Sequence, residues 1–317
     1  MLKVIGSLFF AAFCCSAIAL ADEASCPPPV SQPTPDAVQE GMRNARDHGF
    51  LWRVAKDGRT SFLYGTIHVA KFDWMFPGAQ VMKAIMAADT IALELDIMDP
   101  DIQSRMTNSM AALPRTVVPD SLNRRMRQQA EQVCVPYASI KDSAIEMQVT
   151  TLTIMAGRRY GLEAAYAIDA VLAGIGHNAK RAMVSLETPE QQLQLMRMKN
   201  SQETISFVQD SLLELESGRS LKMIKRIAKV WAESDYADVE HFSDWCECLK
   251  TESEREWMKR ALDDRNPAMA DRIDALHGSG KQVFAAVGSL HMFGPLGLPA
   301  LLEKRGYRVE KVVFKQK

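Results

Sequence analysis

The stretch Thr60-Ser-Phe-Leu-Tyr-Gly-Thr-Ile-His68 decides the fold prediction for this chain. Its apolar, β-prone residues indicate a buried strand that stops at a glycine, and a histidine follows three residues after that glycine. The stretch Gln282-Val-Phe-Ala-Ala-Val-Gly-Ser-Leu-His291 is built to the same plan. After each stretch come a Pro/Gly turn, a helix-like segment and another β-prone run, at residues 90–95 and 307–314. Two such units in one chain predict a site that closes between two halves.

The remaining pattern gives a fold class. Residues 51–56 and 60–65 flank Asp57-Gly58, which is typical of a tight hairpin turn. A further β-prone run at residues 181–187 leads into Thr188-Pro189, a good helix start. Between the terminal units the spacing of apolar residues is mostly helical. We therefore predict an α/β (mixed α+β) fold with a central sheet built from the two strand-Gly-x-x-His-helix-strand units. One domain, residues 46–317, would carry a helical middle segment or lobe at roughly 100–280.

The first residues predict export. A lysine at position 3, an apolar run over residues 4–20 and the small-x-small sequence Ala19-Leu-Ala21 indicate a signal peptide at residues 1–21, cleaved before Asp22. The alternative is an uncleaved anchor, for which the run is short. Residues 22–45 are rich in proline at their start and predict an extended linker or arm. We expect a periplasmic or extracellular protein that leaves the membrane after cleavage.

Composition excludes one class of partner. The chain of 317 residues has a net charge of −1 and 47% hydrophobic residues, which suits a substantial core. No basic block stands out, so a nucleic-acid partner is not expected. The partner expected is a peptide or small-molecule substrate, and the sequence leaves the oligomeric state open.

Four cysteines remain after the predicted cleavage, and in an oxidising compartment they predict disulfides. Only Glu247 separates Cys246 from Cys248, so we expect these two not to pair with each other. Cys26 or Cys134 would join one of them instead. A cysteine metal site is the alternative, but a single Cys-x-Cys is a weak signal for it.

Four predicted strands end beside a potentially reactive side chain: His68, Glu94, Glu187 and His291. The carboxyl ends of parallel strands gather at one edge of a sheet, where ligands bind. The two imidazoles and two carboxylates of such a set can hold a divalent metal ion (zinc, manganese or cobalt) and leave positions for water or substrate. The same residues can also supply an acid and a base without a metal. Each has a structural alternative, as a hydrogen-bonded histidine, a solvent-facing glutamate or a helix cap.

Other residues would support this site. Gly65 and Gly288 lack a Cβ and allow a sharp turn or a close ligand, and Thr66 lies beside the first of them. Arg265 can hold a carboxylate of the site or polarise a substrate carbonyl. Asn266 can assist in the same way, or it can cap the helix that begins at Pro267. The four histidines outside the motifs are expected at the surface: His48, His177, His241 and His277.

A family resemblance rests on motifs spread along the chain. They are Tyr64-Gly-Thr-Ile-His-Val69, Leu93-Glu-Leu-Asp96, Ser185-Leu-Glu-Thr-Pro-Glu-Gln191, Asp264-Arg-Asn266, Ala286-Val-Gly-Ser-Leu-His291 and Gly306-Tyr-Arg-Val309. Together they resemble the TraB/GumN family, which is related to the Tiki metalloproteases and more remotely to erythromycin esterases and a haem-binding lipoprotein fold. The resemblance covers about residues 50–314. It departs from the family pattern at Gly161-Leu-Glu163, where an aspartate is usual; Asp169 comes later, and no role is assigned to it.

The resemblance implies a two-part α/β fold and a metal-dependent peptidase centre formed by His68, Glu94 and His291, with Glu187, Arg265 and Asn266 supporting it. We therefore expect an exported metal-dependent hydrolase, with Glu94 as third ligand or general base and Arg265 or Asn266 steadying an oxyanion. One alternative is a non-catalytic protein that sequesters a peptide, metal or haem. Another is an esterase-like hydrolase without metal, in which a histidine is the base.

Overall fold

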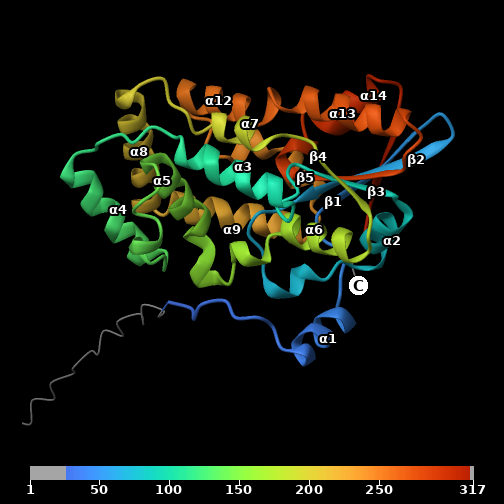
Figure 1. Ribbon diagram of the computed structural model, residues 1–317, viewed down its shortest axis with the longest axis horizontal. Coiled ribbons are helices and arrows are strands. Elements are labelled where there is room, and N and C mark those ends of the chain that lie inside the picture. The colour runs from blue at the N-terminus through green and yellow to red at the C-terminus, as the bar shows by residue number, and fades with distance from the viewer. Residues whose placement is uncertain (1–25, 315–317) are drawn as a thin grey trace, which may run out of the picture.

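A computed structural model describes residues 26–314, and there the chain forms a six-stranded mixed sheet surrounded by helices (Figure 1). The predicted mixed α/β class, with a helical middle segment, is confirmed. The strand order is β4-β3-β5-β2-β1-β6. The predicted signal peptide, residues 1–21, lies outside the described residues. The strands are β1 (Phe50–Lys56), β2 (Arg59–Thr66), β3 (Thr90–Leu93), β4 (Ala182–Ser185), β5 (Val283–Gly288) and β6 (Arg308–Val312).

Strand directions place the ends of both histidine units side by side. Strands β1 and β2 form the predicted antiparallel hairpin, whose turn residues Asp57 and Gly58 have φ of 51° and 72°. Strand β2 pairs in parallel with β5, β5 with β3, and β3 with β4. Every residue of β5 is buried, as expected for a central parallel strand covered on both faces. The carboxyl ends of these four strands therefore meet at one edge.

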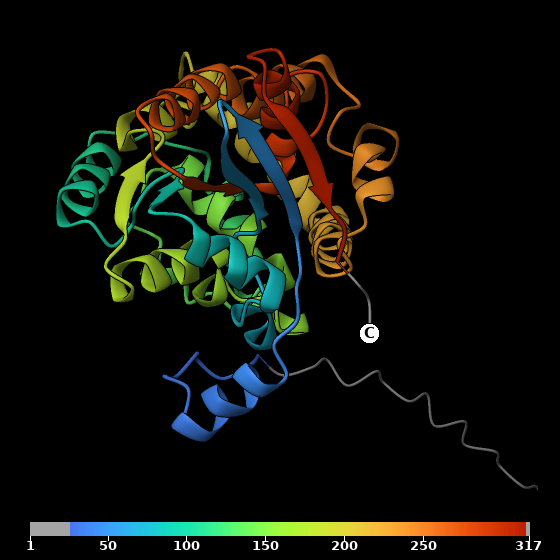
Figure 2. The ribbon, with the colours of Figure 1, turned by 90° about the vertical axis from the view of Figure 1, so that its right-hand side faces the viewer.

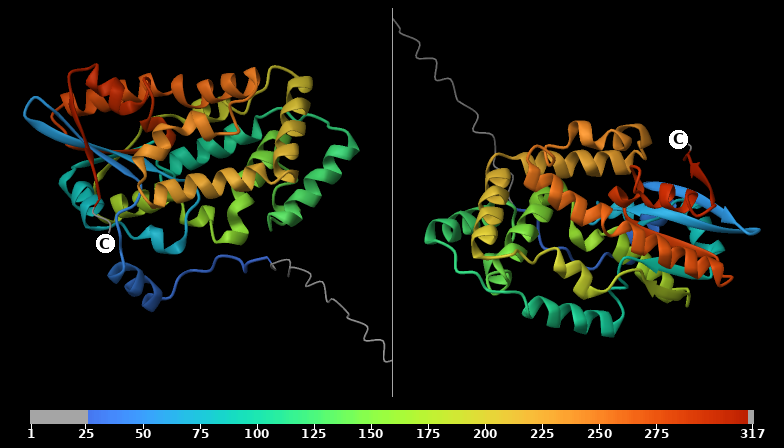
Figure 3. Two further views of the ribbon diagram at one scale, coloured as in Figure 1. Left: turned by 180° about the vertical axis from the view of Figure 1, so that it is seen from behind. Right: turned by 90° about the horizontal axis from the view of Figure 1, so that it is seen from above.

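The helices divide between the sheet and a second, helical core. Helices α4 (Asp120–Gln132), α5 (Ile145–Ile154) and α8 (Ser201–Glu216) enclose buried residues such as Met126, Leu152 and Leu212, apart from the core of the sheet. Figures 1 and 3 show these helices at the end of the molecule away from the strands. None of the helices among residues 26–314 is long and apolar enough to span a bilayer. The α-helices are α1 (Pro35–Arg43), α2 (Ala79–Ala87), α3 (Pro100–Ala111), α4 (Asp120–Gln132), α5 (Ile145–Ile154), α6 (Ile168–Asn178), α7 (Pro189–Gln194), α8 (Ser201–Glu216), α9 (Arg219–Ala232), α10 (Tyr236–Glu240), α11 (Phe242–Trp245), α12 (Glu252–Met258), α13 (Asn266–Gly278) and α14 (Leu298–Glu303). The short 3₁₀-helices are η1 (Phe72–Met75), η2 (Tyr137–Ser139), η3 (Met155–Tyr160), η4 (Ala164–Tyr166) and η6 (Ser289–Met292), and η5 (Lys259–Asp263) is a π-helix.

The arm before the sheet is only partly extended. Residues 26–34 have no regular structure, but residues 35–43 form helix α1, which Figure 2 shows outside the main body. The hydroxyl of Thr34 accepts a hydrogen bond from the backbone N–H of Ala37, and Pro35 occupies the first helical position. A Cβ on Gly41 would lie 2.1 Å from the ring of Phe76, so α1 contacts the main body closely at this point.

The disulfide prediction is wrong in its pairing. The bonds are Cys26–Cys134 and Cys246–Cys248. The Cα atoms of Cys246 and Cys248 lie 5.1 Å apart, within the range that a disulfide spans, because the backbone between them turns back. The Cα atoms of Cys26 and Cys134 are 5.4 Å apart, and this bond ties the N-terminal arm to the end of α4.

Candidate functional site

Three of the predicted site residues meet at Gly288, the last residue of β5. A Cβ placed on Gly288 would lie 3.3 Å from Nε2 of His68, 3.3 Å from Oε1 of Glu94 and 3.7 Å from Cδ2 of His291. These side chains follow β2, β3 and β5, whose parallel pairing brings their ends together. The structure thus places two imidazoles and a carboxylate around one point, which the missing Cβ keeps open.

His68 is oriented by an aspartate from a different element. Its Nδ1 lies 2.9 Å from Oδ2 of Asp169, in the first turn of α6, and Oδ1 of Asp169 accepts a hydrogen bond of 2.6 Å from the hydroxyl of Thr66. The Asp169 carboxylate raises the pKa of His68 to about 9, so the ring is positively charged at neutral pH. The side chain of His68 is 61% exposed, which leaves it open to a ligand from solution.

His291 has the opposite character. It is buried in η6, and its Nδ1 lies 2.6 Å from Oδ1 of Asn266, at the start of α13. The other side-chain atom of Asn266, Nδ2, donates to the carbonyl of Leu296 at 2.8 Å. Burial lowers the pKa of His291 to about 4, so this ring is neutral at pH 7. The side chain of Asn266 therefore orients His291, and both of its polar atoms are used in doing so.

Glu94 is buried and accepts three hydrogen bonds. Its Oε1 accepts from the backbone N–H of Gly288 at 2.7 Å, and its Oε2 accepts from Arg265 at 2.8 Å and from Gln192 at 3.1 Å. Burial acts to raise the pKa of Glu94, but the electrostatic interactions with His291, His68 and Arg265 outweigh burial and lower this pKa to about 2. Glu94 is a carboxylate throughout the physiological range.

Arg265 joins the two buried glutamates. Its Nε donates to Oε1 of Glu187 at 2.8 Å, and its Nη2 donates to Oε2 of both Glu187 and Glu94. Nη1 is held by the carbonyl of Ala261, within the π-helix that precedes Arg265. Gln192 also donates to Oε2 of Glu187, at 3.1 Å. The structure therefore gives Arg265 the expected role of holding carboxylates, and its N–H groups are directed at these rather than at the space beside Gly288.

The two remaining supporting residues are Gly65 and Thr66, and the backbone of each lies against Ser289. A Cβ on Gly65 would lie 2.9 Å from Oγ of Ser289, so only glycine lets β2 approach η6 this closely. The hydroxyl of Ser289 donates to the carbonyl of Thr66 at 2.7 Å. These contacts set the position of His68 relative to His291.

Two of the four other histidines are not at the surface. His277 is fully buried, with Nδ1 2.8 Å from the hydroxyl of Ser61 and Nε2 3.0 Å from the carbonyl of Lys56. His48 is half-buried, and its Nδ1 lies 2.6 Å from the carbonyl of Ala232. The polar sequence neighbours of His277, and the position of His48 before the first strand, predict exposure, but long-range partners in the fold bury both rings. His177 and His241 are exposed, and each pairs with an aspartate, Asp96 and Asp244.

Sequence reasoning missed Asp169 and Gln192. Asp169 is far from His68 in sequence, and it does not follow Gly161-Leu directly, where the family pattern has its aspartate. Its place at the start of a helix was the available signal. Gln192 follows the Thr188–Gln191 capping box on α7, next to Glu187, and that proximity could have suggested it.

The two imidazoles suit a divalent ion better than Glu94 does. Each imidazole is held at Nδ1 by a polar side chain, an arrangement common for metal-binding histidines because it fixes the ring. Glu94, however, already accepts N–H donors on both oxygens. Within residues 26–314 no group of three or more His, Cys, Asp or Glu side chains is arranged to hold a metal ion.

The fold, together with the sheet edge where the parallel strands end, defines a mixed α/β protein with paired Gly-x-x-His motifs around a buried glutamate–arginine network. The chain belongs to the TraB/PrgY/gumN family, whose model matches residues 50–311. It is similar to the uncharacterized protein YbaP of Shigella flexneri, at 20% identity over 246 residues, which cover 77% of this chain and 88% of YbaP. No solved structure matches the chain.

Proposed function

We propose that this protein is a hydrolase that cleaves a peptide bond, or a related carbonyl bond, beside Gly288. The observation that carries the proposal is the meeting of His68, Glu94 and His291 around that residue. Side chains from three strand ends converge there, while Asp169, Asn266 and Arg265 fix their orientation. Preorganised groups of this kind are what a hydrolytic site requires.

The charges at the site suggest what each residue would do. Charged His68 has an N–H at Nε2 that can donate to a substrate carbonyl or to a leaving group. Neutral His291 and ionised Glu94 are weak bases, because their pKa values lie near 4 and 2. Activation of water by either residue alone would therefore be inefficient near pH 7.

This weakness favours a metal-assisted reaction. A divalent ion of zinc, manganese or cobalt would lower the pKa of bound water and polarise the scissile carbonyl. His68 and His291 would hold it, with Glu94 as third ligand once it gives up an N–H partner. Histidine must be neutral to bind a metal, so occupancy would compete with the charge that Asp169 induces on His68.

The test is a degradomic screen of the purified protein against peptides, together with simple esters. We expect turnover in the wild type and none in His68→Ala or His291→Ala; because His291 is buried, His291→Gln provides a gentler variant. Circular dichroism checks that each variant is folded. Metal content is measured on the same samples, followed by chelation and add-back of zinc, manganese and cobalt. Full activity in a folded variant would contradict the site, and full activity after chelation would favour hydrolysis without metal.

A non-catalytic binding protein is the second candidate function. It is favoured by the completed hydrogen bonds of Glu94, whose two oxygens already accept N–H donors from the protein. Such a protein would hold a peptide, metal or haem at the same edge. Release of fragments separates the two functions, since only the hydrolase makes products.

We also propose that the protein is exported to the periplasm or the extracellular space. The Cys26–Cys134 disulfide supports this, because such bonds persist in oxidising compartments. Fractionation of cells and the mass of the mature chain test it: processing before Asp22 is expected, and a full-length cytosolic chain would exclude it.

A further inference from the structure

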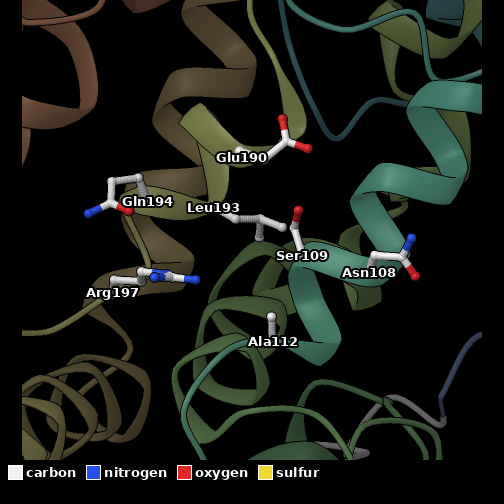
Figure 4. A pocket seen from close by; sticks show the side chains of 7 residues that line it. All are labelled: Asn108, Ser109, Ala112, Glu190, Leu193, Gln194 and Arg197. Carbon is white, nitrogen blue, oxygen red and sulfur yellow. The ribbon is translucent and has the colours of Figure 1, made fainter.

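A cavity lies between α3 and α7, on another side of the helix that carries Gln192. It has a volume of about 380 Å³. That size suits a small ligand or one end of a peptide. Figure 4 shows side chains from both helices around it. The lining includes Asn108, Ser109, Glu190, Leu193, Gln194 and Arg197.

The charged residues of this cavity are not equivalent. Glu190 is held by Arg105 through two hydrogen bonds, from Nε at 3.0 Å and from Nη2 at 2.6 Å. These bonds from Arg105 lower the pKa of Glu190 to about 2 and occupy both of its oxygens. Arg197 is exposed, and among residues 26–314 no carboxylate lies within ion-pair distance of its guanidinium. The cavity therefore offers one unpaired cation, Arg197, beside a carboxylate whose charge is already paired with Arg105.

The neighbouring groups suit the end of a peptide chain. Figure 4 shows the guanidinium of Arg197 reaching from the α7 side toward α3, which supplies Asn108 and Ser109. A guanidinium binds a carboxylate through two parallel hydrogen bonds. The amides of Asn108 and Gln194 can pair with peptide N–H and C=O groups, and Leu193 offers apolar contact to a side chain.

We propose that this cavity binds the carboxyl terminus of a peptide, with Arg197 holding the terminal carboxylate. Helix α7 connects the cavity to the candidate site, because Gln192 donates to Glu94 and Glu187 while its neighbour Leu193 lines the cavity. The proposal that the cavity binds a peptide end depends only on the cavity. Its use as a subsite for substrate rests on the proposed hydrolase function.

Calorimetry with trialanine, compared with trialanine amide, tests the proposal. The His68→Ala protein is used, so that turnover does not consume the probe. The amide should bind at least about tenfold more weakly, since it lacks the charge-assisted pair. Arg197→Gln should weaken trialanine binding by a similar factor and remove the difference between the two probes. The matched control is Arg124→Gln, an exposed arginine on α4 away from this cavity, which should leave both affinities unchanged.

Several results would overturn the assignment. They are equal affinity for acid and amide, no measurable binding of trialanine, or wild-type affinity in Arg197→Gln. Acetate or phosphate that binds as tightly as trialanine would show that a free anion, and not a peptide end, is the occupant. Binding of trialanine, combined with no hydrolytic activity in the wild-type protein, would keep the peptide site and reject the hydrolase.

Discussion

Asp169 controls the charge of His68 through the contact between its Oδ2 and Nδ1 of the ring. Replacing it by asparagine keeps the shape and removes the charge, so we expect the pKa of His68 to fall from about 9 toward its ordinary range. NMR titration of the ring measures this change. Asp244→Asn, which removes the carboxylate beside exposed His241, is the matched control and should leave the His68 signal unmoved. An unchanged pKa in Asp169→Asn would show that Asp169 does not set it.

The same pair predicts how stability depends on pH. The folded-state pKa of His68 is above its unfolded value, so the pair stabilises the fold fully below about pH 6.5. That contribution is lost as pH rises through about 9. Because His68 is 61% exposed, we expect no more than about 1 kcal/mol. Urea denaturation between pH 6 and 10 should show this loss in the wild type and not in Asp169→Asn; parallel curves would contradict the prediction.

Gly288 offers a way to fill the site without removing a reactive group. In Gly288→Ala the new Cβ would lie 3.3 Å from both His68 and Glu94, which can shift slightly to accept it. We expect a folded protein whose turnover falls by no more than about 10²-fold, which is the loss that a 1 Å misplacement of reacting groups causes. Gly174→Ala, on α6 with open space around it, is the control and should keep turnover while gaining about 0.5–1 kcal/mol of stability. Unchanged turnover in Gly288→Ala would place the chemistry elsewhere.

The π-helix η5 and helix α7 act together as the support of the site. One turn of η5 fixes Arg265 through the Ala261 carbonyl, and α7 supplies Gln192, so that two buried carboxylates share one cation and one amide. π-helical turns recur at functional sites because they redirect a side chain. The arrangement makes Arg265 the residue on which both Glu94 and Glu187 depend.

Arg265→Met should therefore be strongly destabilising, by about 3–5 kcal/mol, because it leaves two buried carboxylates without their counter-ion. Urea denaturation at pH 7 measures the loss. The two acids would then gain protons more readily, so the deficit relative to wild type should shrink as pH falls toward 5. Arg105→Met, which unpairs the exposed Glu190, is the comparison and should cost much less. Equal losses, or a deficit independent of pH, would refute the shared-cation role.

These elements show where sequence reasoning succeeds and where it stops. The hairpin, the parallel strand ends and the capped start of α7 were predictable, because local patterns of apolar residues, Asp-Gly and Thr-Pro determine them. The partners Asp169 and Gln192 depend on how α6 and α7 pack against the strands, and no local pattern encodes that packing. His277 was misplaced for the same reason: its neighbours in sequence are polar, but Ser61 and Lys56, its partners, come from the distant hairpin.

Across the molecule, the strands that lead to the two histidines, β2 and β5, lie side by side at the centre of one sheet, while the middle of the chain builds a separate helical core. Strands β2 and β5, from opposite ends of the sequence, are direct neighbours, with Thr66 opposite Gly288. Formation of the candidate site therefore requires nearly the whole chain to fold. Because distant segments must come together, forming the site costs much of the conformational entropy of the unfolded chain.

The Cys26–Cys134 bond reduces the entropy of the unfolded chain, so its removal should lower the stability of the whole molecule. It joins residues separated by 108 positions, whereas Cys246–Cys248 spans a separation of 2. Because the stabilisation grows with the length of the closed loop, we expect Cys26→Ser with Cys134→Ser to lower the free energy of unfolding by about 2–4 kcal/mol. Cys246→Ser with Cys248→Ser should lower it much less. Urea denaturation of both double variants under non-reducing conditions measures the two losses. Equal losses, or a larger loss from the short loop, would show that the N-terminal arm is not held in the way the structure describes.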